Sequence, residues 1–389
     1  MELRDLSLQR AIFRQEAGKP PALLRDIAAR AGVSFNGSAS WDIQVYDPDM
    51  YRRTINQGSL GFGEAYMDGI WDSQRLDELF HRLLCSNVNQ QIRELIRWRH
   101  FAQVLRHHLL NLQSISRAFR VGERHYDIGN DVFEAMLDSR MNYSCGYWAK
   151  AGDLEQAQRD KLDLICRKLE LRAGERVLDI GCGWGGFARF AAEQYGVEVT
   201  AATVSREQCR WAQQYCKELP VTISLVDYRE LKGRYDKIAS IGMFEHVGPK
   251  NYPIFFDTVH RVLKDDGLFL LHTIGSENTS AYCDPWVDRY IFPNGHLPSA
   301  CQLAQTLEGR FLIEDWHNFG PDYDRTLMAW WENFEAAWPR LKQRYNQRFY
   351  RTWKYYLMSC AGMFRAKQGQ LWQLVLGKRQ RQETYRSIR

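Results

Sequence analysis

Two side chains that can exchange protons near neutral pH each follow an apolar, strand-like segment. Glu245 comes shortly after residues 237–241 (KIASI), and His272 lies near the end of residues 268–273 (LFLLHT). In an open parallel sheet, ligands bind beyond the carboxyl ends of the strands, so we expect both side chains to point into one crevice. A buried carboxyl and a buried imidazole can be purely structural, but the position of both at strand ends favours acid–base chemistry.

A glycine-rich turn after another strand predicts a ligand site at the same edge of the sheet. Residues 177–186 (VLDIGCGWGG) lead from an apolar strand into a turn with alternating glycines, and residues 187–194 have a helical pattern. Glycine lets the backbone bend sharply and approach a ligand closely, although similar turns also occur for packing reasons. The order strand, turn, helix resembles the first nucleotide-binding element of a Rossmann-like fold, in the form that binds S-adenosylmethionine. The candidate cofactor-binding residues here are Asp179, Gly181, Cys182, Gly183, Trp184, Gly185 and Gly186.

The second predicted strand, residues 196–203 (GVEVTAAT), ends without the acidic residue that usually binds the ribose in methyltransferases of this fold. Thr203, Val204 and Ser205 occupy that place instead. Thr203 and Gln208 can offer a hydroxyl and an amide to the same ligand groups. We therefore include all four residues among the candidate cofactor ligands.

A third predicted strand, residues 221–226, is followed by Asp227 and Tyr228. Asp227 is placed to accept a hydrogen bond from an adenine amino group, and Tyr228 could pack on the adenine ring. A capping turn is the alternative role for this pair of residues.

Composition and charge exclude several other classes of protein. The chain has 389 residues and a formal net charge of +5, which is too small to indicate nucleic-acid binding but suits contact with an anionic lipid surface. No segment approaches the roughly 20 apolar residues that span a bilayer, so we expect no membrane-spanning helix. The 9 cysteines are scattered and form no C-x-x-C pair, which predicts reduced thiols, a cytoplasmic location and no metal site.

Three regions are predicted along the chain. Residues 1–90 are expected to form a small, mostly helical domain, and residues 91–120 a basic amphipathic linker. Residues 121–389 alternate between strands and helices, which predicts an α/β fold with a doubly wound, Rossmann-like sheet. The linker is either a connecting helix or a surface element attracted to anionic lipid, and the sequence leaves both interpretations open.

Longer segments resemble the cyclopropane-fatty-acyl-phospholipid synthases of bacteria. They are distributed over nearly the whole chain: residues 58–69 (GSLGFGEAYMDG), 125–131 (HYDIGND), 143–148 (YSCGYW), 284–295 (DPWVDRYIFPNG), 319–323 (FGPDY) and 355–361 (YYLMSCA). The resemblance implies a class I methyltransferase fold. It also implies a reaction, in which the methyl group of S-adenosylmethionine is added to a cis double bond of a phospholipid acyl chain. A carbocation forms, a base removes a proton, and a cyclopropane ring closes.

The resemblance also implies roles for particular residues. Those matching the family's ligands of a bound bicarbonate, the expected base, are Cys145, Glu245, His272, Tyr323 and the backbone of Ile274. Glu245 could instead be the base itself, and the sequence does not separate these two mechanisms. Tyr143 and Ser144 join the cofactor-binding residues.

Cys360 matches a cysteine that has been labelled catalytic in this family. It lies in residues 355–364, which have the pattern of an apolar helix, where a cysteine is usually a small buried hydrophobe. The mechanism that the resemblance implies needs no thiolate, so a catalytic role and a packing role remain alternatives.

The family resemblance further implies a homodimer that acts on phospholipid bilayers from the inner face of the membrane, with the N-terminal domain engaging the lipid. Two alternatives are a fatty-acyl C-methyltransferase that leaves a methyl or methylene branch, and a non-catalytic lipid-binding module. A nucleic-acid methyltransferase is disfavoured, because residues 243–246 (MFEH) stand where such enzymes have an Asn-Pro-Pro-Tyr-like loop.

Overall fold

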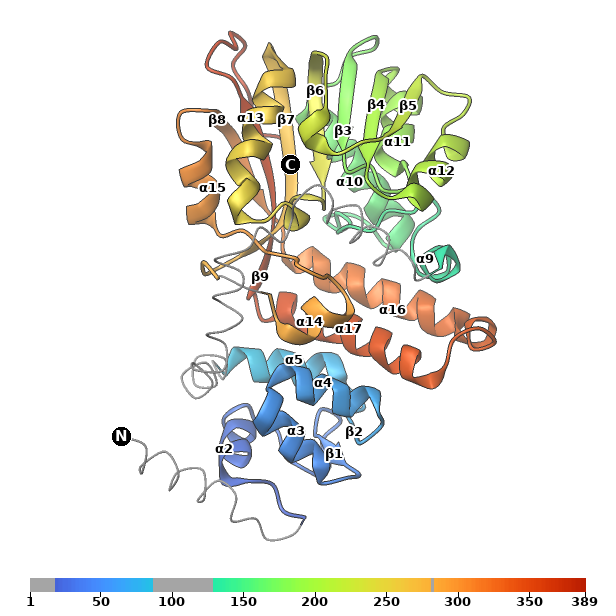
Figure 1. Ribbon diagram of the computed structural model, residues 1–389, viewed down its shortest axis with the longest axis vertical. Coiled ribbons are helices and arrows are strands. Elements are labelled where there is room, and N and C mark those ends of the chain that lie inside the picture. Colours follow the sequence, from blue (N-terminus) through green and yellow to red (C-terminus); the bar gives the residue numbers. More distant parts are fainter. Residues whose placement is uncertain (1–17, 87–128, 281–282) are drawn as a thin grey trace. The chain divides into compact units, whose positions relative to one another are not determined.

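The computed structural model describes residues 18–86, 129–280 and 283–389 (Figure 1), and these form two compact units. The first contains the described part of Met1–Gln103 together with Asp284–Ile291 and Pro339–Gln368. The second contains the described part of Val104–Cys283 together with Phe292–Trp338 and Gly369–Arg389. The predicted linker 91–120 lies outside the described residues, so the boundaries 1–90, 91–120 and 121–389 stay a prediction.

The first unit is mostly helical. Its elements are α2 (Ala22–Arg30), β1 (Gln44–Val45), α3 (Asp49–Gln57), α4 (Ser59–Met67), β2 (Trp71–Asp72), α5 (Leu76–Cys85), α14 (Pro285–Tyr290) and α17 (Gln347–Arg365). The long helix α17 packs against α4 and α5. Gly362 permits this approach, because a Cβ atom there would lie 2.6 Å from the Cβ of Phe80 on α5. The unit is therefore assembled from segments that are distant in the sequence.

The second unit is built on a seven-stranded sheet with the order β5-β4-β3-β6-β7-β9-β8. The strands are β3 (Arg176–Ile180), β4 (Glu198–Thr203), β5 (Val221–Leu225), β6 (Tyr235–Ile241), β7 (Leu263–Ser276), β8 (Leu312–Asn318) and β9 (Gly369–Gly377). Neighbouring strands are parallel except that β9 runs antiparallel to both β7 and β8. The first five strands coincide with the predicted ones to within a few residues, whereas β8 and β9 were not predicted.

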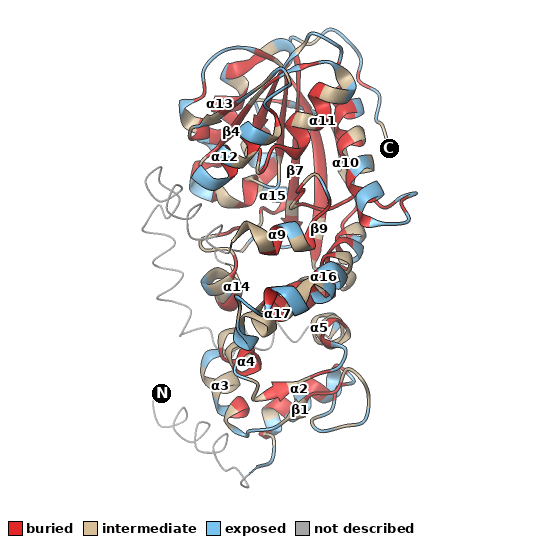
Figure 2. Cartoon of the chain, turned by 90° about the vertical axis from the view of Figure 1, so that its right-hand side faces the viewer, coloured by how far each residue is buried: buried red, intermediate tan, exposed pale blue. Residues whose placement is uncertain are grey.

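Helices cover both faces of this sheet (Figure 1), which confirms the predicted α/β class. Successive side chains of a strand point to opposite faces. Val177 accordingly packs with α10 (Leu154–Lys168), α11 (Gly186–Tyr195) and α12 (Arg206–Tyr215), and Leu178 packs with α13 (Tyr252–Val262) and α15 (Ala300–Leu307). In Figure 2 the strands β7 and β9 are coloured as buried. Helices α9 (Asn130–Met136) and α16 (Pro321–Leu341) complete the elements.

The order of the strands defines where a ligand can bind. From β3 the chain moves outward to β4 and β5, then returns to form β6 on the other side of β3. The point between β3 and β6, where the direction reverses, is the position at which open α/β sheets bind ligands beyond their carboxyl ends. The glycine-rich turn follows β3 and Glu245 follows β6, so both lie at this switch point.

Candidate active site

The glycine-rich turn after β3 adopts a backbone that side chains rarely allow. Gly181, Gly183 and Gly185 have φ angles of +85°, +53° and +87°. A Cβ at Gly181 would lie 2.5 Å from Cγ of Met243, and one at Gly186 would lie 2.6 Å from the carbonyl oxygen of Arg140. A Cβ at Gly183 would meet no heavy atom within 4 Å, so the turn is open on that side. The turn therefore has the shape predicted for a ligand-binding loop, bounded by packing on two sides.

Asp179, on β3 just before this turn, is a buried acid with an unsatisfied oxygen. Its side chain is 1% exposed, and no described group bonds its Oδ2 atom. Burial raises the pKa of this carboxyl to about 7, and the positive charge of Lys161 opposes that shift. A buried carboxyl oxygen that no described residue bonds fits a cationic hydrogen-bond donor on a ligand.

The segment that carries Tyr143 and Ser144 lies next to the end of β6, because a Cβ at Gly242 would be 3.7 Å from Cβ of Ser144. The Ser144 hydroxyl accepts a hydrogen bond of 2.9 Å from Nζ of Lys161, and its carbonyl accepts one of 2.8 Å from Nε2 of Gln158. The ring of Tyr143 lies 5.2 Å from that of Trp330. The structure thus brings two predicted cofactor residues to the switch point.

Trp184 and Cys182 complete the turn as buried side chains. Trp184 donates a hydrogen bond of 3.3 Å from Nε1 to Oδ1 of Asn130, and the Cys182 amide donates to the carbonyl oxygen of Ala202 at 3.0 Å. These contacts tie the turn to α9 and to the end of β4. Both residues support the shape of the turn.

The residues that end β4 bond chiefly to one another. The Thr203 hydroxyl donates to Oε1 of Gln208 at 3.2 Å, and the Ser205 hydroxyl caps α12 by accepting from the Gln208 amide at 3.3 Å. Val204 between them is half-buried. Contact of these four residues with a cofactor stays a prediction.

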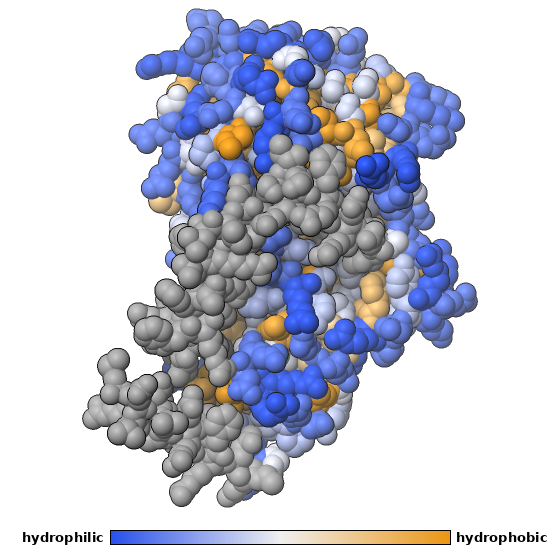
Figure 3. All heavy atoms as spheres, in the orientation of Figure 1, coloured by the Kyte–Doolittle hydropathy of each residue, from blue (hydrophilic) through white to orange (hydrophobic). Residues whose placement is uncertain are grey.

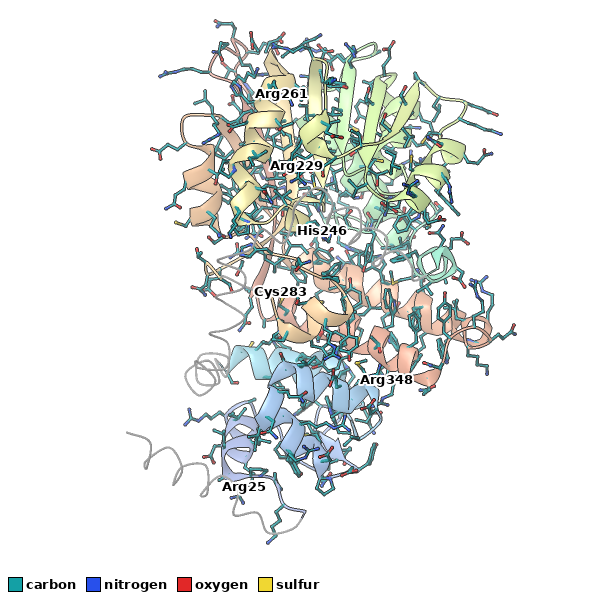
Figure 4. The ribbon with its side chains drawn as sticks, viewed as in Figure 1. Arg25, Arg229, His246, Arg261, Cys283 and Arg348 are labelled. Atoms are coloured by element: carbon teal, nitrogen blue, oxygen red, sulfur yellow. The ribbon has the colours of Figure 1, made fainter. Side chains whose placement is uncertain are left out.

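The structure gives Asp227 the capping role that the sequence left as the alternative. Oδ1 of Asp227 accepts from the Arg229 amide at 3.0 Å and from Nε of Arg229 at 2.7 Å, and Oδ2 accepts from the same guanidinium at 2.9 Å. Arg229 is labelled in Figure 4. The Tyr228 ring packs edge-on against Phe255, 5.3 Å away, within the core. Recognition of adenine by Asp227 and Tyr228 stays a prediction.

Glu245 occupies a short 3₁₀ helix, η2 (Phe244–His246), directly after β6. The position of His246 in Figure 4 marks this helix. Oε1 of Glu245 accepts a hydrogen bond of 2.6 Å from the backbone amide of Ile274, whereas Oε2 is buried and has no partner in the described chain. Burial raises the pKa of this carboxyl to about 7. Glu245 therefore changes charge near neutral pH, as an acid–base group must.

His272 lies on β7 beside Glu245, since Ile241 at the end of β6 pairs with His272 in the sheet. The imidazole is 1% exposed, and burial holds its pKa well below the usual range, so the ring is neutral. Its Nδ1 atom is 3.2 Å from Nε2 of Gln373, the residue directly opposite on β9. With this orientation of the Gln373 amide, its nitrogen donates to Nδ1, and the ring proton is then on Nε2. That Nε2 atom is buried and has no partner among the described residues.

The remaining predicted catalytic residues differ in their surroundings. The Cys145 thiol is buried, which raises its pKa well above the usual range, and its Sγ donates to the carbonyl oxygen of Gly146 at 3.2 Å. Tyr323 is on α16, and its ring is 6.1 Å from that of Trp330. Cys360 belongs to the first unit, on α17, and burial raises the pKa of its thiol to about 12. A thiolate is therefore unfavourable at both cysteines near neutral pH.

Three buried polar residues around the site were not predicted: Gln158, Lys161 and Gln373. The signal was present in the sequence. Gln373 interrupts the apolar strand LWQLVLG, and Lys161 lies on the buried face of α10. Buried amides and ammonium groups are uncommon without a partner, so their position on an apolar face indicates a specific role.

The described residues hold no group of three or more His, Cys, Asp or Glu side chains that could bind a metal ion. No disulfide bond joins cysteines within the described residues.

Comparison with known proteins agrees with this geometry. Residues 113–374 match the family described as mycolic acid cyclopropane synthetase. The chain is 53% identical over 359 residues to the cyclopropane-fatty-acyl-phospholipid synthase of Escherichia coli K12, covering 92% of this chain and 93% of that protein. It is 36% identical over 253 residues to a probable fatty acid methyltransferase of Pseudomonas putida, covering 62% of this chain and 64% of that protein.

Solved structures show the same relationship. The mycolic acid cyclopropane synthase CmaA1, in complex with SAH and CTAB, superimposes with a TM-score of 0.62 at 31% identity, covering 67% of this chain and 98% of that one. The extent of these matches, together with a class I methyltransferase sheet and its glycine-rich turn, shows that the chain belongs to the mycolic acid cyclopropane synthetase family of S-adenosylmethionine-dependent methyltransferases.

Proposed function

We propose that this protein transfers a methyl group from S-adenosylmethionine to a cis double bond of a phospholipid acyl chain and closes a cyclopropane ring. The observation that carries the proposal is a pair of atoms without described partners, one on Glu245 just after β6 and one on His272 within β7. Oε2 of Glu245 accepts protons and Nε2 of His272 donates one, and both are buried. Proton removal is the step that distinguishes ring closure from simple methylation, and this pair can support it.

The residues at the switch point fit S-adenosylmethionine, which supplies an electrophilic methyl group on a sulfonium. Asp179 offers a buried carboxylate oxygen for the ligand's ammonium, Ser144 offers a hydroxyl, and the open side of the turn at Gly183 lets the backbone approach. An alkene is a weak nucleophile, so holding the two reactants in line supplies much of the rate enhancement.

Aromatic side chains pack around Tyr143 in the second unit. Tyr143 lies 5.2 Å from Phe133, 5.2 Å from Trp330 and 6.5 Å from Phe292, measured between ring centroids. Aromatic faces stabilise a carbocation and exclude the water that would trap it. These rings therefore favour an outcome in which the cation survives until a proton is removed.

His272 and Glu245 also fit bicarbonate, which would act as the proton acceptor when bound. Nε2–H of His272 donates to an anionic oxygen, and Oε2 of Glu245 accepts the hydroxyl proton that bicarbonate carries. In the described structure the Ile274 amide donates to Glu245 and so orients this carboxylate. Direct proton removal by Glu245 is the competing mechanism, and activity measured with and without bicarbonate separates the two.

The lipid, dimer and location assignments are part of the same proposal. The substrate is an acyl chain of a bilayer, and the enzyme is a homodimer that associates peripherally with the inner face of the membrane. No helix in the described ranges has the length and apolar character needed to cross a membrane. The net charge of +5 favours attraction to an anionic surface, and Figure 3 shows a visible face that is mostly hydrophilic with smaller hydrophobic patches.

The test uses the full chain with S-adenosylmethionine, bicarbonate and vesicles of a cis-monounsaturated phospholipid. We expect acyl chains that gain one CH2, show upfield cyclopropyl proton signals and lose their vinyl protons. No mass gain, with the cofactor still bound, would refute the enzymatic proposal on this substrate and favour a lipid-binding module.

A second candidate is a fatty-acyl C-methyltransferase that leaves a branched chain, favoured by the 36% identity to the probable fatty acid methyltransferase. The same mass gain without ring signals would identify it.

A further inference from the structure

We infer that Lys161 fixes the hydrogen-bond direction of Ser144, so that Ser144 donates its hydroxyl proton to the carboxylate of the cofactor's amino-acid group. Lys161 is thus a positioning residue for cofactor binding. The inference rests on the proposed cofactor, and it adds a residue that neither the motifs nor the family resemblance assigned.

The direction follows from the chemistry of an ammonium group. Nζ of Lys161 lies 2.9 Å from Oγ of Ser144 and 3.4 Å from Oδ1 of Asn142. An ammonium has only donors, so Oγ of Ser144 must accept, and the hydroxyl proton of Ser144 points elsewhere. Gln158, one turn earlier on α10, donates to the Ser144 carbonyl at 2.8 Å and holds the backbone in place.

The second acceptor of Lys161 is Oδ1 of Asn142, and the other contacts of Asn142 define its orientation. Nδ2 of Asn142 donates to Oδ2 of Asp138 at 2.7 Å, which turns Oδ1 of Asn142 toward Lys161. The backbone amide of Asn142 donates to Oδ1 of Asp138 at 2.8 Å. Asp138 therefore orients Asn142 and acts on Lys161 only through this neutral amide and through space.

The charge of Lys161 lacks a direct counterion in the described part of the chain. Lys161 is 1% exposed, the described contacts of its Nζ are with Asn142 and Ser144, and burial lowers its pKa to about 8. A buried cation is costly unless an anion approaches it. Asp179, whose Oδ2 is a buried oxygen that lacks a described partner, interacts with Lys161 only through space.

These two groups together match an α-amino acid. Asp179 complements a ligand ammonium, and Ser144, oriented by Lys161, complements a ligand carboxylate. S-adenosylmethionine and S-adenosylhomocysteine carry both groups, whereas 5′-methylthioadenosine has the same adenosine but lacks the amino-acid end. The difference in affinity between the last two ligands therefore reports on this part of the site alone.

The test measures the dissociation constants of S-adenosylhomocysteine and 5′-methylthioadenosine by calorimetry for the wild-type chain and Lys161→Met. Methionine keeps much of the volume and removes the charge. A hydrogen bond to a charged group corresponds to about tenfold to hundredfold in affinity, so we expect S-adenosylhomocysteine to weaken by that factor. The affinity for 5′-methylthioadenosine should stay within about twofold.

The matched control is Lys168→Met, which removes the other fully buried lysine of α10, paired with Asp315 at 3.3 Å. We expect this variant to leave both affinities unchanged. Ser144→Ala provides a second test if Lys161→Met fails to fold, because it should weaken only S-adenosylhomocysteine. In a double variant, the loss should be smaller than the sum of the two single losses, because both residues act on the same ligand carboxylate.

Equal weakening of both ligands by Lys161→Met would overturn the inference, because it would indicate general collapse of the pocket. Unchanged affinity for S-adenosylhomocysteine would overturn it too. If the wild-type chain bound neither ligand, the proposed function itself would fail. A selective effect in a protein that binds cofactor but modifies no acyl chain would support the inference and contradict the proposed reaction.

Discussion

Replacing Glu245 by Gln should stabilise the protein at alkaline pH while abolishing its activity. The Glu245 carboxyl is 8% exposed, and burial raises its pKa from 4.5 to about 7. Each unit of pKa shift corresponds to about 1.4 kcal/mol, so ionising this group costs the folded state roughly 3 kcal/mol. Glutamine can still accept the hydrogen bond that the Ile274 amide donates at 2.6 Å, but it carries no charge.

The pH dependence has a definite sign. Below pH 4.5 the carboxyl is neutral in both the folded and the unfolded state, so it does not destabilise the fold. As the pH rises from 4.5 through about 7, the unfolded state ionises first, and the free energy of unfolding of the wild type falls. Glu245→Gln does not share this loss. The variant and the wild type should therefore have similar free energies of unfolding near pH 4.5–5, and the variant should be more stable by up to about 3 kcal/mol above pH 8.

The assay is urea unfolding of both proteins in buffers freed of carbon dioxide, at several values between pH 5 and pH 9. Taking the difference between two variants cancels the titration of every other group. The control is Glu218→Gln, whose side chain is 86% exposed, and which should show no pH-dependent difference. A gap between Glu245→Gln and the wild type that did not change with pH, or a variant less stable at every pH, would refute this account of the buried carboxyl.

Three further outcomes are expected. Gly181→Ala should weaken S-adenosylhomocysteine binding at least tenfold in calorimetry, because its φ is +85° and the new Cβ would lie 2.5 Å from Cγ of Met243; unchanged binding would contradict the packing. Cys360→Ala should keep more than half of the wild-type kcat in the vesicle assay, because a thiol with a pKa of about 12 is not ionised at neutral pH. Gln373→Glu should place an acceptor opposite Nδ1 of His272, 3.2 Å away in the wild type, and move the ring proton to Nδ1. Nitrogen NMR of labelled histidine would then show the exchanged tautomer, together with a loss of kcat.

The sequence predicted the part of the fold that is local. Strand-end reasoning placed Glu245 and His272 together, and the structure has Glu245 in η2 directly after β6 and His272 on the neighbouring strand β7, each with a buried atom that lacks a described partner. The glycine turn could be predicted because its backbone requires a particular residue type at each position. Both features are set by short segments, in which the residue types alone indicate the local backbone conformation.

The features that the sequence did not predict depend on distant pairings. Strand β9 lies between β7 and β8 although it is nearly 100 residues after β7 in the chain, and its apolar run could equally have been a helix. Gln373 therefore could not be placed opposite His272 before the antiparallel register was known. For the same reason, the first unit's use of α14 and α17 could not be read from composition.

Burial of ionisable groups gives this site its chemical character. Glu245 and Asp179 both have a pKa raised to about 7, and Lys161 has a pKa lowered to about 8, in each case because burial disfavours the charged form. In the unliganded protein these groups are poised between neutral and charged states near physiological pH. A ligand that brings an ammonium to Asp179, or a carboxylate to Ser144 beside Lys161, supplies the missing counter-charge and shifts these equilibria toward ionisation. Cofactor binding should therefore release a proton from Asp179 and add one to Lys161. The buffer dependence of the calorimetric binding enthalpy would measure the net number of protons exchanged.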